Sequence, residues 1–169
     1  MDILKEYGIS YEDTVKLNEH AIKASELCYA PYSHFKVGAA ILSSSGKIIT
    51  GGNVENASYG ATVCAERSAV LRFKAEGEKN IVAISVYIHA EGYGFYPTPC
   101  GMCRQVLSEF GFFPIICCKT PTSFIVKTVS SMLPYVFRSL TTPPHIFAPD
   151  PKNLTEVIES AEYLSLIHI

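Results

Sequence analysis

The sequence predicts an α/β layered domain, and two observations support that prediction. Segments rich in Ile, Val and Phe alternate along the chain with segments whose apolar residues follow helical spacing. The chain has 169 residues, 48% of them hydrophobic and 18% charged, which is typical of a globular protein that buries a substantial core. We expect one domain over residues 1–140 and a tail over residues 141–169 that packs on it.

The first half of the chain is expected to form a helix and then a β-hairpin. Ser10 is a candidate cap for the helix, with Asp13 in its first turn. Helical spacing predicts a buried stripe made of Leu17, Ala21, Ala24 and Cys28. Two strands are expected over residues 35–42 and 47–54, because the intervening Ser-Ser-Ser-Gly sequence is typical of a turn.

The rest of the chain is expected to contain three helices and three strands. Thr62 is a candidate cap for a helix that runs to about Glu76, with Gly77 as its C-terminal stop. A third helix is expected over residues 101–110. The remaining strands are expected over residues 81–89, 113–118 and 124–129. Loops are expected over residues 53–60 and 91–99, and a short terminal helix over residues 153–164.

Three cysteines and one glutamate form the most informative pattern in the chain. Glu66 follows Cys64 by two residues, and Cys100 and Cys103 come later in the sequence Pro-Cys-Gly-Met-Cys. All three cysteines fall at or near expected helix starts, where free N–H groups and the helix dipole favour thiolates. Three thiolates can hold one zinc ion and leave a position open for water, whereas a structural zinc site normally has four protein ligands. The pattern therefore predicts zinc-assisted hydrolysis, with one Zn²⁺ per chain.

Glu66 is the candidate proton carrier of this site. It is close enough in sequence to Cys64 to approach the open face of the metal without being a ligand, so it could move protons between water and a substrate. Three thiolates on Zn²⁺ leave a net charge of about −1 on the ligand set. We hypothesise that Arg67, next to Glu66, offsets this charge by donating hydrogen bonds to a ligand sulfur.

The cysteines also allow a structural or a redox interpretation. A Cys-X-X-Cys pair on its own is often redox-active or part of a structural zinc site. A structural site would need a fourth ligand, for which His34 and His89 are the nearby histidines. The glutamate beside Cys64 favours the catalytic interpretation. The other cysteines lie in apolar segments and are expected to be buried packing residues: Cys28, Cys117 and Cys118.

Charge and hydropathy argue against several classes of partner. The net charge is −2 and the chain has no dense block of Lys and Arg, which argues against a nucleic-acid partner. No apolar run approaches the roughly 20 residues that span a membrane, and no signal peptide is expected. We therefore expect a cytoplasmic protein, in which disulfides are rare, so metal-binding or catalytic roles are favoured for its six cysteines. A small neutral substrate fits these properties best.

Four segments of the chain resemble the small homotetrameric zinc-dependent cytidine deaminases. The segments read Ala30-Pro31-Tyr32-Ser33-His34-Phe35-Lys36-Val37-Gly38-Ala39-Ala40, Gly52-Asn53-Val54-Glu55-Asn56-Ala57-Ser58-Tyr59-Gly60, Thr62-Val63-Cys64-Ala65-Glu66-Arg67 and Pro99-Cys100-Gly101-Met102-Cys103-Arg104-Gln105. They follow the order and spacing of that family. The resemblance covers residues 10–140 approximately, and four motifs together make it highly specific.

The resemblance implies a three-layer α/β/α fold with a mixed central sheet of about five strands. The three cysteines described above would bind Zn²⁺, and Glu66 would carry protons. Asn53 and Glu55 would hydrogen-bond the ribose hydroxyls, and Phe35 would pack against the nucleoside. The rest of the substrate segment would line the site: Val54, Asn56, Ala57, Ser58 and Tyr59.

The implied reaction is the hydrolytic deamination of cytidine and deoxycytidine to uridine and deoxyuridine, in pyrimidine salvage. Water would attack C4 of the cytosine ring, and Glu66 would transfer protons to N3 and then to the departing amine. The expected substrate is a free pyrimidine nucleoside, which enters a closed pocket without base flipping. Water is the second reactant, and no nucleic acid or membrane is expected as a partner.

Three other functions share parts of this pattern. A deaminase of a cytosine nucleoside antibiotic has similar zinc motifs, but the Asn-Val-Glu-Asn sequence that starts at Asn53 favours the ordinary nucleoside. A polynucleotide deaminase generally has a histidine where this chain has Cys64. A zinc-stabilised binding module without activity would not depend on Glu66.

The resemblance also implies a homotetramer with active sites at the subunit interfaces. The sequence Met132-Leu133-Pro134-Tyr135-Val136-Phe137 resembles a Leu-Leu-Pro-x-x-Phe segment of the family, with Met132 in place of the first Leu. By this analogy Phe137 could reach the site of a neighbouring subunit. The alternative for Phe137 is an ordinary core aromatic on a short helix.

Overall fold

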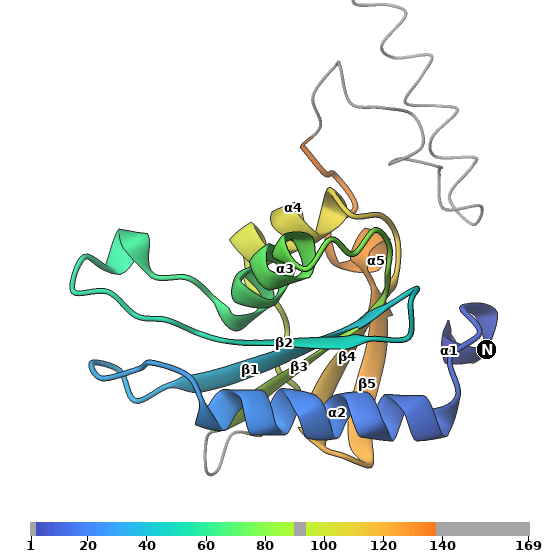
Figure 1. The fold of residues 1–169 in the computed structure, drawn as a ribbon, viewed down its shortest axis with the longest axis horizontal. Helices are drawn as coiled ribbons and strands as arrows, with labels where there is room; N and C mark the ends of the chain where they lie inside the picture. Colours follow the sequence, from blue (N-terminus) through green and yellow to red (C-terminus); the bar gives the residue numbers. More distant parts are fainter. Residues whose placement is uncertain (1–2, 90–93, 138–169) are drawn as a thin grey trace, which may run out of the picture. The chain divides into compact units, whose positions relative to one another are not determined.

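A mixed five-stranded sheet with helices on both faces forms the body of the protein (Figure 1). The computed structural model describes residues 3–89 and 94–137. One compact unit ends at Val136, so Phe137, the last described residue, falls outside it. The predicted three-layer α/β/α architecture is confirmed. The predicted tail over residues 141–169 and its helix over residues 153–164 lie outside the described residues.

The strands lie in the order β2-β1-β3-β4-β5 across the sheet. Their bounds are Lys36–Ser43 for β1, Ile48–Gly52 for β2, Ile81–His89 for β3, Pro114–Thr120 for β4 and Ser123–Thr128 for β5. Only β3 and β4 run parallel among these neighbours, while the other three pairs are antiparallel. A parallel pair needs a crossover connection, and here it contains α4, Gly101–Ser108. Because α4 follows β3, its N-terminus lies toward the end of the sheet where β3 finishes.

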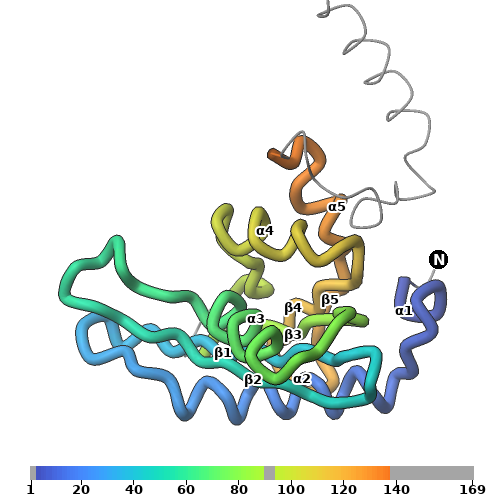
Figure 2. Tube along the Cα trace, turned by 45° about the horizontal axis from the view of Figure 1, so that its top comes forward, coloured from blue at the N-terminus to red at the C-terminus, as the bar shows by residue number. Residues whose placement is uncertain are grey.

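Two hydrophobic layers hold the helices on the sheet. The helix α2, Tyr11–Glu26, covers one face, and α3, Ala65–Ala75, lies beside α4 on the other (Figures 1 and 2). Alternation along β1 supplies both layers, since Ala39 and Ile41 pack with the α3 side and Ala40 packs with the α2 side. The shorter helices are α1, Ile3–Glu6, α5, Val129–Met132, and the 3₁₀ turn η1, Tyr59–Ala61.

Glycines let the two main helices approach the sheet closely. A Cβ atom at Gly38 of β1 would lie 2.0 Å from the carbonyl oxygen of Ala21 in α2. A Cβ atom at Gly51 of β2 would lie 2.3 Å from the backbone nitrogen of Ala69 in α3. Real side chains do not tolerate such distances, so these two positions set how near α2 and α3 lie to the strands.

The structure corrects the predicted start of the second helix. The N-cap of α3 is Cys64, not Thr62, whose hydroxyl instead accepts a hydrogen bond from the backbone N–H of Asn56 at 3.2 Å. Thr62 does not cap the helix because its loop folds back, and its hydroxyl bonds to the backbone of Asn56 instead. The predicted stop is confirmed, since Gly77 follows the helix with φ of +77°.

The first helix agrees with its predicted start but ends sooner than its apolar spacing suggested. Ser10 is the N-cap of α2, and its side chain accepts a hydrogen bond from the backbone N–H of Asp13. Leu17 and Ala21 are buried as predicted. Cys28 lies beyond the helix, which ends at Glu26, and is half-buried rather than part of a buried stripe. The helix α1 and the turn η1 were not predicted from the sequence.

Candidate active site

The four sequence segments singled out above meet at one edge of the sheet, where β3 finishes. Lys36 pairs with His89 and Gly38 pairs with Gly52, so β1 begins and β2 ends at this edge. The start of α3 lies there too, because a Cβ atom at Gly51 would lie 2.8 Å from the carbonyl oxygen of Ala65. Chain topology, rather than proximity in sequence, therefore brings the two helix starts and the two loops together.

The three predicted zinc ligands converge at this edge. Their sulfur atoms all lie within 4.8 Å of one another, with Cys64 and Cys100 at 3.8 Å. Cys64 and Cys100 are the N-caps of α3 and α4, and neither makes a side-chain capping hydrogen bond. Their sulfurs are therefore not used by the helix and remain available to a metal. Cys103 lies one turn into α4 and is fully buried.

The geometry of this group fits Zn²⁺. Two sulfurs that each lie about 2.3 Å from a tetrahedral zinc ion are about 3.8 Å apart, the separation of the Cys64 and Cys100 sulfurs. The group contains three cysteines, and neither His34 nor His89 belongs to it. Among the described residues no fourth Cys, His, Asp or Glu joins it, which favours a site with an open position over a closed structural site.

Arg67 lies against this cluster, and its predicted role of offsetting the charge of the ligands stays a prediction. One of its terminal nitrogens donates to the carbonyl oxygen of Thr62 at 2.7 Å and to the sulfur of Cys64 at 3.8 Å. Its Nε is buried without a hydrogen-bond partner. A buried donor beside a thiol suits a ligand set that becomes anionic when it holds zinc.

The thiols differ in their tendency to ionise. A hydrogen bond from Cys103, assisted by Arg67, lowers the pKa of Cys64 to about 5 although partial burial acts in the opposite direction. The same hydrogen bond and burial raise the pKa of Cys103. The first thiolate of the metal-free cluster is therefore Cys64, and a metal ion would displace the remaining protons.

Glu66 is buried at the start of α3, with 4% of its surface exposed. Burial raises its pKa above the ordinary value of 4.5, and the nearby charge of Cys64 acts in the same direction. Its side chain also interacts with Cys103. A carboxyl group whose pKa is shifted toward neutrality, held beside a three-thiol cluster, can both accept and release a proton.

The predicted substrate segment is attached directly to the start of α3. The backbone groups of Val54 and Val63 exchange two hydrogen bonds of 2.9 Å, and Val54 also forms a bridge with Tyr29. The residues between Val54 and Val63 therefore form a closed loop that begins and ends next to Cys64. Figure 1 shows this loop and the chain around residue 32 projecting at the same end of the molecule.

Asn53 uses its side chain to hold the loop that carries Phe35. Its Oδ1 accepts from the backbone N–H of Val37 at 2.8 Å, and its Nδ2 donates to the carbonyl oxygen of Phe35 at 2.9 Å. The residue is 6% exposed. An amide nitrogen has two hydrogens, so one N–H remains for a further partner beyond Phe35.

Glu55 holds the same loop from the other side. Its carboxylate accepts hydrogen bonds from the backbone N–H groups of Tyr32 and Ser33 and from the Ser33 hydroxyl, which also accepts from the backbone N–H of Phe35. These bonds, that of the Ser33 hydroxyl first, lower the pKa of Glu55. A carboxylate has about four acceptor positions, so it could still accept a bond from a ligand. The loop also contains His34, whose φ of 57° is left-handed.

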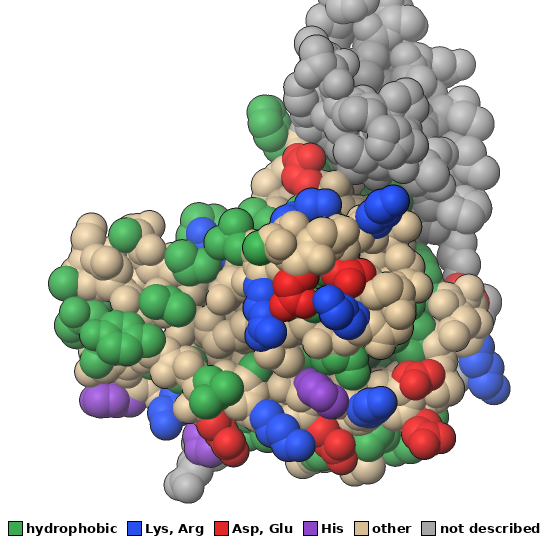
Figure 3. Space-filling model, viewed as in Figure 1, with side chains coloured by type: hydrophobic (Ala, Val, Ile, Leu, Met, Phe, Trp, Pro, Cys, Tyr) green, Lys and Arg blue, Asp and Glu red, His purple; other side chains and the backbone are tan. Residues whose placement is uncertain are grey.

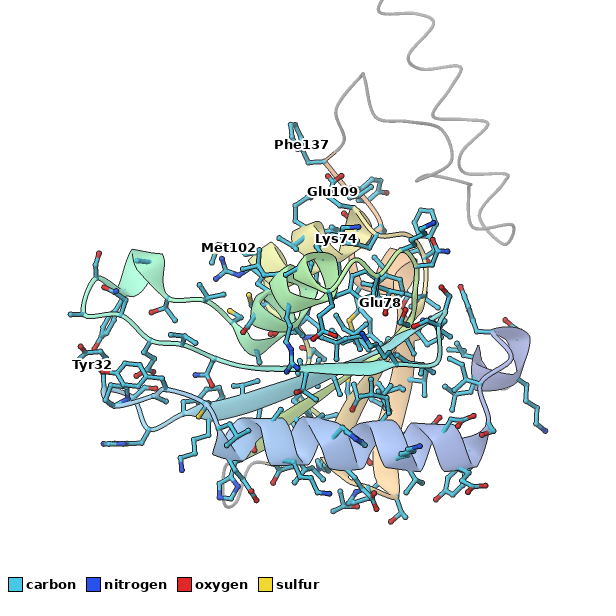
Figure 4. The ribbon with its side chains drawn as sticks, viewed as in Figure 1. Tyr32, Lys74, Glu78, Met102, Glu109 and Phe137 are labelled. Atoms are coloured by element: carbon cyan, nitrogen blue, oxygen red, sulfur yellow. The ribbon has the colours of Figure 1, made fainter. Side chains whose placement is uncertain are left out.

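The remaining predicted substrate residues lie on the surface of this loop pair. Phe35, Val54 and Tyr59 are exposed, and the Tyr59 ring meets the Tyr32 ring edge-on with centroids 6.3 Å apart. Figure 4 shows Tyr32 at the outer end of the loops. The other members, Asn56, Ala57 and Ser58, are exposed as well. Their predicted roles toward a nucleoside stay predictions.

Two further residues have positions that sequence reasoning did not assign. Ser33 connects Glu55 to Phe35, and Arg104 binds the turn that precedes Cys100. Both residues belong to the four segments quoted above, and that membership is the sequence feature that could have identified them as part of the site. Phe137 is 81% exposed, which contradicts the alternative of a core aromatic, while its predicted contact with a neighbouring subunit stays a prediction.

Comparisons with known sequences agree with this site. The profile of the family described as "Cytidine and deoxycytidylate deaminase zinc-binding region" matches residues 11–119, a range that includes all three cysteines and Glu66. A probable cytidine deaminase of Dictyostelium discoideum is 41% identical over 129 residues, covering 76% of this chain and 86% of that protein. The cytidine deaminase of Halalkalibacterium halodurans is 48% identical over 98 residues, covering 57% of this chain and 71% of that protein.

Solved structures show the same relationship. The crystal structure of cytidine deaminase from Burkholderia pseudomallei matches with a TM-score of 0.66 at 40% identity, covering 72% of this chain and 97% of that chain. The cytidine deaminase from Mycobacterium tuberculosis matches with a TM-score of 0.62 at 37% identity, covering 73% of this chain and 96% of that chain. The resemblance to zinc-dependent cytidine deaminases is therefore confirmed, while the homotetramer stays a prediction. This chain belongs to the cytidine and deoxycytidylate deaminase zinc-binding family.

Proposed function

We propose that this chain catalyses the hydrolytic deamination of cytidine and deoxycytidine to uridine and deoxyuridine, in pyrimidine salvage. The observation that carries this proposal is the buried Glu66 carboxyl, with its raised pKa, beside the cluster of three thiols. Relatives that are named cytidine deaminase support the choice of substrate.

The chemistry divides between a metal and the residues around it. Cys64, Cys100 and Cys103 would hold Zn²⁺, which when bound supplies a Lewis acid that makes water more acidic. Glu66 accepts a proton as the oxygen of water forms its bond to C4 of the base, and donates it to N3. Glu66 then accepts the second proton of that oxygen as the C4 carbonyl forms, and delivers it to the exocyclic amine as the C4–N bond breaks, which releases ammonia. Arg67 compensates the negative charge of the ligand set.

The substrate would be held by the two loops at the edge of the sheet. The spare N–H of Asn53 and the spare acceptor position of Glu55 suit the ribose hydroxyls, and the Phe35 ring suits the face of a base. The rest of the segment up to Tyr59 would line the site. Because Asn53 and Glu55 also hold the loop backbone, they would fix the shape of the pocket as well as contact the sugar.

We further propose a cytoplasmic homotetramer whose sites lie at subunit interfaces, with Phe137 reaching a neighbouring site. The cytoplasmic placement rests on the three clustered cysteines, because metal-binding thiols are typical of reducing compartments. In the described part of the chain no helix has the length and apolarity to cross a membrane. Charges of both signs lie interspersed on the face shown in Figure 3, which supports a small substrate rather than a polynucleotide. Sedimentation of the full chain would test the tetramer.

Cytidine turnover measured on a preparation of known zinc content tests the proposed activity. We expect loss of cytidine absorbance with about one zinc per chain. Turnover of a cytosine nucleoside antibiotic alone would identify the rival deaminase. Bound zinc with no turnover of any nucleoside would contradict the proposal and support a zinc-stabilised binding module.

A further inference from the structure

Arg104 makes an unusual set of contacts for a residue next to a predicted metal ligand. Its Nε donates to the carbonyl oxygen of Pro99 at 2.7 Å, directly before Cys100. Its terminal nitrogens donate to the carbonyl oxygen of Met132 at 3.2 Å and to the Thr98 hydroxyl at 3.4 Å. One half-buried side chain thus connects the turn that delivers a zinc ligand to a second segment, 28 residues away.

The position of Cys100 needs such support. Cys100 is exposed, it caps α4 without a side-chain hydrogen bond, and the preceding residues 94–99 form no helix or strand. The backbone N–H of Arg104 bonds to the carbonyl oxygen of Cys100 at 3.0 Å. Arg104 therefore holds this turn through both its backbone and its side chain, whereas Cys103 is held by burial in the core. Figure 4 marks this helix start by the label of Met102.

The other end of the connection is the last turn of α5. Met132 is the final residue of that helix, so its carbonyl oxygen has no partner within the helix. A guanidinium donor at this position satisfies the carbonyl and is favoured by the charge distribution of a helix end. The backbone N–H of Leu133 closes the same turn by donating to the carbonyl oxygen of Val129 at 3.0 Å.

Among the described residues, no ion pair neutralises the charge of Arg104. In the described residues, Lys47 forms salt bridges with Glu76 and Glu78, and Arg72 forms one with Glu76. Arg104 takes part in none of them. Arg104 follows Cys103 directly in the chain, and its Nε bonds the residue directly before Cys100. Arg104 is thus a second cation, after Arg67, near a ligand set that carries negative charge when it holds zinc.

We propose that Arg104 is a positioning residue that couples the turn of Cys100 to the end of α5, so that zinc binding and the order of residues 129–133 depend on each other. The guanidinium does this because it can donate to three acceptors in fixed directions. A lysine at the same position would keep the charge and lose most of this geometry. The inference rests on the proposed zinc site but not on the identity of the substrate.

Zinc affinity of full-length variants provides the first test. In chelator competition we expect Arg104→Gln to weaken zinc binding by about 10-fold to 100-fold, as for other residues that orient metal ligands. Arg104→Lys should fall between Arg104→Gln and the wild type. Arg72→Gln is the matched control, because Arg72 is paired with Glu76 on the exposed face of α3, and it should leave the affinity unchanged. Wild-type affinity in either Arg104 variant, or an equal loss in the control, would overturn the proposal.

Amide hydrogen exchange of the unmodified protein provides a second test that needs no variant. Adding Zn²⁺ to chelator-treated protein should slow exchange at Arg104 and, through the proposed connection, at Leu133. Slower exchange at Arg104 with no change at Leu133 would overturn the proposal even if Arg104→Gln failed to fold. Neither test involves a nucleoside, so a failure of the proposed enzymatic activity would be distinguished from a failure of this inference.

Discussion

The metal end and the substrate end of the site are positioned by different forces. The metal end, made of Cys64, Glu66, Cys100 and Cys103, is built on two helix starts above the hydrophobic core. The substrate end, made of residues 30–35 and 53–61, consists of loops that are exposed apart from the buried Asn53 and the half-buried Glu55, and side-chain hydrogen bonds hold these loops to one another. Core packing therefore positions the proposed catalytic groups, and polar bonds between loops position the groups that would contact the nucleoside. Changes at the two ends should affect different kinetic and binding parameters.

Removal of the Glu66 carboxylate should have the largest effect. Glu66→Gln keeps the shape of the side chain but removes its capacity to carry a proton, so turnover should fall about 10²- to 10⁴-fold or more. Zinc content and thermal stability should stay close to those of the wild type. The measurement is kcat for cytidine normalised to bound zinc, and full activity of this variant would refute the proposed proton carrier.

Adding one methyl group at a glycine should lower the stability of the protein at the metal end but not at the substrate end. Gly51→Ala would place a Cβ atom 2.3 Å from the backbone of Ala69 and so push α3 away from the sheet. We expect a loss of about 1–3 kcal/mol in the free energy of unfolding, with weaker zinc binding, since α3 carries Cys64. Gly60→Ala in the substrate end meets no atom within 4 Å and should change little. Equal denaturation midpoints for the two variants would contradict the comparison.

Loss of the Asn53 amide should act mainly on substrate binding. Asn53→Ala would leave the N–H of Val37 and the carbonyl of Phe35 without their partner, at a cost of about 1–3 kcal/mol. We expect KM to rise on the order of tenfold, the change that about 1.4 kcal/mol produces, while zinc content stays constant. Asn18→Ala is the control, because Asn18 bonds Ser85 and Pro121 through a buried amide on the α2 side. It should lower stability and leave KM unchanged.

The smallest expected effect is a loosening of the substrate end in acid. The hydrogen bonds of Glu55, that of the Ser33 hydroxyl first, hold its pKa below the ordinary value of 4.5. Its contribution to loop stability is therefore complete above pH 4.5 and is lost as the pH falls through its pKa in the folded protein. Exchange protection at the amides of Tyr32 and Ser33 should decrease in that range. Glu55→Gln should remove this dependence, whereas Glu76→Gln, which changes a carboxylate on another part of the surface, should not.

Most of the fold could be predicted because its signals are local. The strand over residues 81–89 and the cap at Ser10 were predicted correctly, since periodicity and capping chemistry extend over only a few residues. The cap at Thr62 was predicted wrongly. Thr62 has the usual capping chemistry, but its hydroxyl bonds to Asn56 across the loop, and that choice depends on contacts outside the helix.

The sequence by itself determined the family, the candidate zinc ligands and the proposed proton carrier, because these depend on residue types at short spacings that form helix starts. Only the tertiary structure decided how Asn53 and Glu55 are engaged with the loop backbone, and that Arg104 reaches Met132. Those contacts join segments that lie 16, 23 and 28 residues apart. Their formation depends on strand order and on the packing of α4 against α5, which local patterns of residues do not specify.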